Sequence, residues 1–207
     1  MASSDSQKYH EDLSEYLEPT RSIDSDHRAI VAKARELTRD CTTDVEKAKA
    51  LYEYVRDSNN DDACEEPVAS KVLECGGNDC RLRSILLAAL CRAVGIPARL
   101  RYQKVWIKGW RDPRDGGEKD IVFAHGLAGI YLDGDWHLYE VVGNKEKWVM
   151  WTGDESRANE MPVEFRPGRD CLFKLDGNIR GEILPASFAD WGKEIERLIE
   201  GIDDYGN

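Results

Sequence analysis

The fold is decided by residues 76–102, which read GGNDCRLRSILLAALCRAVGIPARLRY. Within this stretch, residues 81–94 are apolar on almost every side, a pattern typical of a helix buried in the core of a domain. Glycines stand before and after the predicted helix, where they favour the turns that end helices. From Ile96 to Tyr102 apolar and polar residues alternate, which predicts a strand. The stretch therefore predicts a central helix that leads directly into a sheet.

Helical spacing of apolar residues predicts further helices ahead of the central stretch. They are segment 9–17, a helix from the cap Asp26 to Leu37, a helix from the cap Thr43 to Val55, and a helix from Pro67 to Leu73. A hairpin is predicted after the central stretch, because segments 121–132 and 135–142 flank Asp133-Gly134, a strong signal for a two-residue turn. The weaker predictions are an exposed loop at 110–119, strands at 148–151 and 171–175, and a closing helix at 188–199.

The order of these elements, helices first and an antiparallel sheet after them, predicts an α+β fold. A chain of 207 residues with 41% hydrophobic content can build one well-packed core. We therefore expect a single domain over residues 1–207, in which the small polar residues 1–7 are disordered.

Charge and cysteine usage narrow the classes of function. A net charge of −11 leaves little to neutralise phosphates, so neither a nucleic-acid partner nor binding to an anionic membrane is expected. No apolar run approaches the roughly 18 residues of a membrane span, and no secretory signal is seen, which predicts a cytoplasmic protein. The six cysteines show neither a disulfide framework nor zinc-finger spacing, so we expect reduced thiols and no metal or other cofactor.

Among the cysteines, Cys80 has the position of a nucleophile. It follows the turn Gly76-Gly77 and begins the buried helix, where unpaired backbone amides and the helix dipole stabilise a thiolate. Its own amide is also placed to hold an oxyanion. The alternative interpretation is a small hydrophobe packed in the core, which is the expected fate of Cys91 inside the same helix.

The predicted hairpin indicates which histidine, His125 or His137, could act as the base for Cys80. With a two-residue turn at 133–134, positions whose numbers sum to 267 lie opposite each other. His125 and Glu140 are then diagonal neighbours on one face, within reach of their side chains, whereas His137 points to the other face. A carboxylate beside an imidazole orients it and stabilises its charged form, as in a nucleophilic triad. The alternative is a cross-strand pair without chemical function.

Several segments together carry a resemblance to a known family. They are 16–20, 23–27, 54–57, 69–73, 80–90, 95–100, His125-Gly126 and 131–136. With these segments the chain resembles the transglutaminase-like superfamily of papain-like cysteine enzymes, and within it the microbial transglutaminase-like proteins of unassigned function. The resemblance covers most of residues 16–140 and implies a papain-like fold in which the helix with the nucleophile packs on an antiparallel sheet. It also implies Cys80 as nucleophile, His125 as base and Glu140 as third member of the triad.

The chain departs from the family pattern at three places. Glu140 stands where the superfamily usually has Asp, Asn78 where a second glycine is usual, and Ser58-Asn59-Asn60 where relatives place an aromatic residue. Either of the last two changes would accompany a new substrate or a lost activity.

The resemblance implies acyl chemistry through a thioester on Cys80, with water or an amine as acceptor of the acyl group. The expected substrate is a peptide amide or a small molecule. Two alternatives stay open. One is a biosynthetic tailoring enzyme that uses Cys80 and His125 on a small or carrier-bound metabolite, and the other is a non-catalytic binding module that keeps the fold. The oligomeric state is open as well.

Overall fold

A computed structural model describes residues 12–58, 64, 66–77, 79–111, 116–141, 164–172 and 179–183. The predictions for 1–7, 148–151 and 188–199, and the departures at Asn59 and Asn78, lie outside these residues. The described part forms helices up to Ala93 and strands from Ala98 onward, which confirms the α+β prediction.

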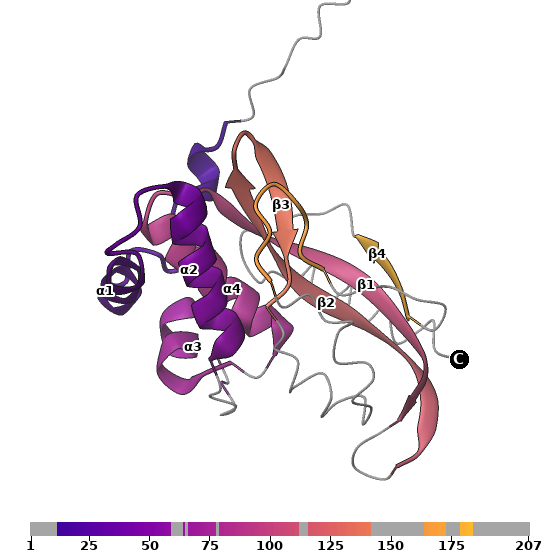
Figure 1. Ribbon diagram of the computed structural model, residues 1–207. Coiled ribbons are helices and arrows are strands. Elements are labelled where there is room, and N and C mark those ends of the chain that lie inside the picture. The colour runs from indigo at the N-terminus through magenta and orange to yellow at the C-terminus, as the bar shows by residue number, and fades with distance from the viewer. Residues whose placement is uncertain are drawn as a thin grey trace, which may run out of the picture.

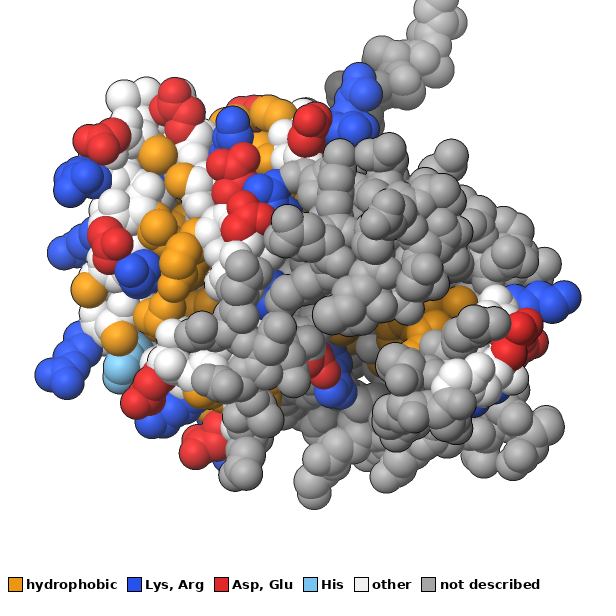
Figure 2. All heavy atoms as spheres, turned by 60° about the horizontal axis from the view of Figure 1, so that its bottom comes forward, with side chains coloured by type: hydrophobic (Ala, Val, Ile, Leu, Met, Phe, Trp, Pro, Cys, Tyr) orange, Lys and Arg blue, Asp and Glu red, His pale blue; other side chains and the backbone are white. Residues whose placement is uncertain are grey.

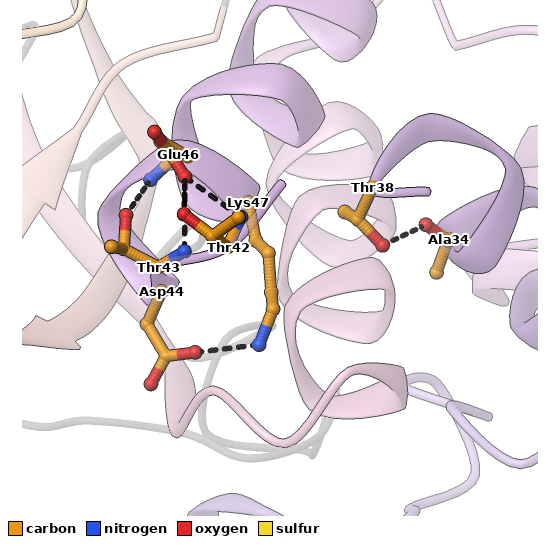
Figure 3. Close-up of polar contacts among 7 residues, drawn as sticks. All are labelled: Ala34, Thr38, Thr42, Thr43, Asp44, Glu46 and Lys47. Atoms are coloured by element: carbon orange, nitrogen blue, oxygen red, sulfur yellow. Dashed lines mark hydrogen bonds and ion pairs between the residues drawn. The ribbon is translucent and has the colours of Figure 1, made fainter. Parts of the chain in front are cut away.

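Helix α2 (Asp44–Asp57) illustrates how the local sequence fixes a helix start. The Thr43 side chain accepts a hydrogen bond from the Glu46 amide, and the Glu46 carboxylate accepts one from the Thr43 amide (Figure 3). The backbone and side chain of Thr42 donate to the same carboxylate, and these bonds together lower the pKa of Glu46 to about 2. The predicted cap at Thr43 is confirmed.

The helices before α2 differ in detail from the predictions. Helix α1 (Arg28–Leu37) is capped by His27, whose Nδ1 accepts from the second amide along the chain, and not by Asp26. An imidazole nitrogen can replace the carboxylate because it offers a lone pair at similar reach. Of the predicted helix 9–17, the described residues form only the 3-10 helix η1 (Ser14–Tyr16).

Helix α4 (Cys80–Ala93) is the predicted central helix. It follows α3 (Ala69–Cys75), and Gly76, with φ of 79°, turns the chain between the two helices. Helices α1, α2 and α3 pack around α4 on the side away from the sheet (Figure 1). Eleven of its residues are buried, so α4 forms the centre of the molecule.

The sheet has four antiparallel strands in the order β3-β2-β1-β4 (Figure 1). They are β1 (Ala98–Arg111), β2 (Glu118–Leu132), β3 (Asp135–Tyr139) and β4 (Ile179–Ile183). Strands β1 and β2 pair as far as Arg111 and Glu118, so the prediction of a loop over 110–119 is wrong at both of its ends. Strand β4 was not predicted.

The hairpin between β2 and β3 has the predicted register. Asp133 and Gly134 have φ of 53° and 90°, the positive values that a type I′ turn requires. Leu132 then lies opposite Asp135, and pairing continues with the same sum of 267 to the last pair of the ladder. The predicted turn and register are confirmed for these pairs, but the predicted second strand over 135–142 is wrong at its end, because β3 stops at Tyr139 and the Glu140 amide bonds to Cys171 instead.

The hydrophobic core lies between α4 and one face of the sheet. Leu100 and Tyr102 from β1 and Ala128 and Ile130 from β2 are buried there with the apolar residues of α4.

The surface of the helical part is mixed in charge. Figure 2 shows acidic and basic side chains interspersed over the described helices. Exposed pairs such as Lys33–Glu36 and Lys47–Asp44, both 2.8 Å apart, contribute little to stability, about 0.5 kcal/mol each. Within the described ranges, none of the helices has the length and apolar character needed to cross a membrane.

Two of the six cysteines form a disulfide. Cys64 and Cys75 are joined, with their Cα atoms 5.9 Å apart. The prediction that all six thiols are reduced is therefore wrong for this pair. Spacing in the sequence did not reveal it, because the chain returns from the end of α3 to the segment before α3 only in the folded protein. The other cysteines are free: Cys41, Cys80, Cys91 and Cys171.

Candidate active site

Cys80 is the first residue of α4 and is 9% exposed. The carboxylate of Asp79, the residue before it, accepts from the Arg81 amide at 2.7 Å and from the Arg81 guanidinium at 2.6 to 3.0 Å. Burial opposes ionisation of this carboxyl group, but the bonds and the charge of Arg81 outweigh it and hold the pKa of Asp79 below its usual value. Asp79 therefore fixes the start of the helix, and the predicted position of Cys80 in the first turn is confirmed.

The Cys80 thiol lies against the edge of β2 beyond the end of β3. Strand β3 ends at Tyr139, opposite Ala128, so no residue of β3 pairs with Gly126. Alternation along the ladder directs the Gly126 amide to this side of the strand, and it donates to Cys80 Sγ at 3.3 Å. A Cβ atom at Gly126 would lie 2.7 Å from the Cα of Arg81, so only a glycine lets α4 approach β2 this closely without a shift.

His125 and Glu140 form a buried ion pair beside the thiol. His125 is 2% exposed and Glu140 is 3% exposed, and Nε2 of the imidazole lies 2.8 Å from Oε1 of the carboxylate. His125 also forms a side-chain hydrogen bond with Cys80. The Glu140 amide donates to the Cys171 carbonyl at 2.9 Å and anchors the carboxylate. The structure thus brings Cys80, His125 and Glu140 together.

The electrostatics of this group favour a charged imidazole. Burial alone would lower the pKa of His125, but the negative charge of Glu140 and the thiolate form of Cys80 outweigh burial and hold that pKa well above its usual value. Two cations interact with the thiol, His125 from β2 and Arg81 from the same helix, and each is paired with a carboxylate, Glu140 and Asp79 respectively. The arrangement suits a thiolate paired with an imidazolium.

A metal site is not seen at this position or elsewhere in the described part of the chain. In the described residues, no group of three or more His, Cys, Asp or Glu side chains is arranged to hold a metal ion. His137 is the alternative base on the hairpin. It lies in β3 opposite Ile130 of β2, four residues along β2 from Gly126, which contacts Cys80.

Sequence reasoning missed two residues of this region. Gly126 was quoted only as part of a matching segment, and its role depends on a close approach that the sequence does not display. Arg83 has no role in the sequence analysis, but it is 1% exposed and bonds to four backbone carbonyls. A charged residue within an apolar helix was the one signal that could have drawn attention to it.

Comparisons with known proteins identify what the chain is similar to. None of the curated proteins matches the chain in sequence. It is similar to the solved structure of a candidate cysteine protease from Cytophaga hutchinsonii, with a TM-score of 0.49, 23% identity, and coverage of 65% of this chain and 43% of that one. A candidate protease from Parabacteroides distasonis has a TM-score of 0.36 and 18% identity, over 61% of this chain and 24% of that one. The chain thus spans less than half the length of either.

The family model of the transglutaminase-like superfamily matches residues 31–149. This range is more than half of the chain, and it contains the start of α4, the β2–β3 hairpin and the three site residues Cys80, His125 and Glu140. The chain therefore belongs to the transglutaminase-like superfamily.

Proposed function

We propose that the protein is a cysteine-dependent hydrolase or acyltransferase that forms a thioester on Cys80. The observation that carries the proposal is the set of contacts around the thiol. It accepts the Gly126 amide and bonds to His125, which is itself paired with Glu140 at 2.8 Å. Membership of the superfamily supports cysteine-dependent enzyme activity in general.

The first half of the reaction follows from these contacts. The Cys80 thiolate attacks the carbonyl carbon of an amide or ester, a C–S bond forms, and the carbonyl oxygen becomes an oxyanion. The amide of Cys80, at the first helical position, has no acceptor within its own helix and is available to this oxyanion. The imidazolium of His125 then gives its proton to the leaving amine or alcohol as the bond to the carbonyl carbon breaks.

The second half reverses these roles. Neutral His125 takes a proton from water or from an acceptor amine, which attacks the thioester carbonyl. The C–S bond breaks, and the thiolate is regenerated beside the imidazolium. Glu140 keeps the ring oriented through both halves and stabilises its charged form. Water as acceptor gives hydrolysis and an amine gives transfer, and the same residues serve both.

The substrate class we propose is a peptide amide, an ester or a thioester, with no cofactor. The cytoplasmic location and the absence of a nucleic-acid partner remain parts of the proposal. The departures at Asn59 and Asn78 motivate the second candidate, a tailoring enzyme that acts on a small or carrier-bound metabolite with the same pair.

The test is trapping of the thioester. Wild type, Cys80→Ala and Cys41→Ala are incubated with a panel of activated esters, thioesters and glutamine amides, and acyl adducts are located by peptide mass spectrometry. We expect an adduct on Cys80 in wild type and in Cys41→Ala, and none in Cys80→Ala, because Cys41 is a partly exposed free thiol away from His125. If all three variants acquire the same adducts on the other cysteines and none on Cys80, the proposal is wrong and a binding module becomes the better interpretation.

A further inference from the structure

A buried cation lies one helical turn after Cys80. Arg83 is 1% exposed, and all three nitrogens of its guanidinium donate to backbone carbonyls. The acceptors and distances are Gly77 at 2.6 Å, Ser58 at 2.8 Å, Val55 at 3.1 Å and Arg56 at 3.2 Å.

These carbonyls belong to two segments that lie about 20 residues apart in the sequence. Three of them are at the C-terminal end of α2, where the last carbonyls of a helix lack partners within it and carry its partial negative charge. The fourth is Gly77, in the turn that leads from α3 to the nucleophile. One side chain of α4 therefore ties the residues just before Cys80 to the end of a different helix.

The turn at Gly76-Gly77 is not closely packed on the side that faces α2. A cavity of about 190 Å³ lies there, lined by Gly76, Gly77 and Arg83 with Tyr54 and Leu73. Apolar side chains do not fill the cavity. Hydrogen bonds therefore contribute more to fixing the conformation of the turn. Arg83 supplies such a bond to the Gly77 carbonyl at 2.6 Å.

Arg83 also brings positive charge to the interior. Residues three apart lie on one face of a helix, and long side chains point back toward the helix start, so the guanidinium is directed to the end of α4 that holds Cys80. A buried cation near a thiol favours the thiolate over the neutral form. Burying an arginine is costly without full hydrogen bonding, and here four backbone carbonyls, one of them in the turn before Cys80, offset that cost.

We propose that Arg83 is a positioning residue for the proposed Cys80 chemistry. It fixes the turn that presents Cys80 to His125, and its buried charge favours the thiolate that attacks the substrate. This inference rests on the proposed function and assigns a role to a residue outside the Cys80–His125–Glu140 group.

Arg92 supplies a matched control on the same helix. It is 4% exposed, and it too donates to backbone carbonyls, those of Ala98 and Glu18. It lies three turns away, at the end of α4 opposite to Cys80. Loss of either arginine should therefore destabilise the fold, but only loss of Arg83 should alter Cys80.

The experiment measures the rate of iodoacetamide alkylation of Cys80 between pH 5 and 9 by peptide mass spectrometry, with thermal unfolding and acyl turnover recorded on the same samples. The variants are Arg83→Met, Arg83→Lys, Arg92→Met and Arg92→Lys. We expect Arg83→Met to slow Cys80 alkylation at pH 6 about 10-fold and to move the profile to higher pH. Arg83→Lys keeps the charge without the forked donors, so it should slow alkylation at every pH and keep the shape of the profile. Both Arg92 variants should keep the wild-type profile at a lower melting temperature.

The outcomes separate this inference from the proposed function. If wild type turns over substrate and the Arg83 and Arg92 variants share one Cys80 profile, Arg83 is purely structural and the inference is overturned. If Arg83→Met does not fold, an unchanged rate in Arg83→Lys overturns it equally. If wild-type Cys80 reacts no faster than Cys41 at pH 6, the proposed function fails and the role of Arg83 fails with it.

Discussion

Cys80 and Cys91 lie on the same buried helix, three turns apart, and their surroundings differ in every respect that matters for reactivity. Cys91 is 0% exposed among apolar side chains, and burial raises the pKa of its thiol. Cys80 is 9% exposed at the helix start, accepts the Gly126 amide and bonds to His125. Burial in an apolar core disfavours a thiolate at Cys91. At Cys80, in the first turn of the same helix, the Gly126 amide and the His125 imidazolium favour one.

The largest effect should come from removing the cation that distinguishes the two thiols. In His125→Asn, acyl turnover should fall by at least about 100-fold, the usual contribution of a general acid or base. Alkylation of Cys80 at pH 6 should approach the slow rate of Cys91, because the imidazolium no longer stabilises the thiolate. Both rates are measured on the same samples, with His137→Asn as the control histidine of the same hairpin. A wild-type alkylation rate in His125→Asn would remove the basis of the comparison.

A smaller effect is expected when the carboxylate loses its charge in Glu140→Gln. Burial lowers the pKa of His125 and the charge of Glu140 is the main influence that raises it, so this pKa should fall in the variant. The raised pKa stabilises the folded protein below the ordinary histidine value of about 6.5, and the stabilisation is lost as pH rises through the folded-state pKa. In Glu140→Gln this stabilisation should be smaller, and its loss should be complete at a lower pH.

The measurement is an NMR titration of the His125 ring together with urea unfolding at several pH values. His137→Gln serves as the control, because that ring does not contact Glu140 in the register. An unchanged His125 titration in Glu140→Gln would mean that the 2.8 Å pair does not govern the imidazole in solution.

A third variant tests the other thiol of the comparison, Cys91. Cys91→Ser should lower the free energy of unfolding by about 1–3 kcal/mol, because a hydroxyl replaces a thiol among apolar neighbours. Alkylation of Cys80 should stay at the wild-type rate. Urea unfolding and peptide mass spectrometry test the two halves, and slower alkylation of Cys80 would show that the ends of α4 are coupled.

The smallest effect is expected at the start of α2. Thr43→Ala removes the capping bond to Glu46 and should cost about 1 kcal/mol. The cap is at the opposite end of α2 from the carbonyls that Arg83 binds, so Cys80 should react as in wild type. Thermal unfolding and alkylation are again compared. A change in Cys80 reactivity would indicate that any loss of stability alters the site, which would weaken the contrast between Arg83 and Arg92.

Features that depend on local chemistry were predictable from the sequence. Asp133-Gly134 specifies one kind of turn, the turn fixes the register, and the register puts Glu140 beside His125. The apolar run of α4 similarly specifies a central helix. The family resemblance then added the connection between Cys80 and this hairpin, which neither segment reveals alone.

Features that depend on contacts between distant segments were not predictable. Strand β4 pairs with β1 at Gln103 and Ile183, and its five residues carry a weak pattern interrupted by a glycine. The Cys64–Cys75 disulfide and the buried state of Arg83 arise in the same way, from how α2, α3 and the turn before α4 come together. A charged residue in a helix is ordinarily taken for a surface residue.

The early end of β3 has a consequence for how this site could be gained or lost. At Gly126 the thiol of Cys80 takes the place that the Val141 carbonyl would take if β3 continued for two more pairs. A longer β3 and the Cys80 thiol would therefore compete for the same hydrogen-bond donor, the Gly126 amide. Lengthening the hairpin by two pairs would bring Val141 opposite Gly126 and displace the thiol, so the length of β3 decides whether the Gly126 amide serves the sheet or Cys80.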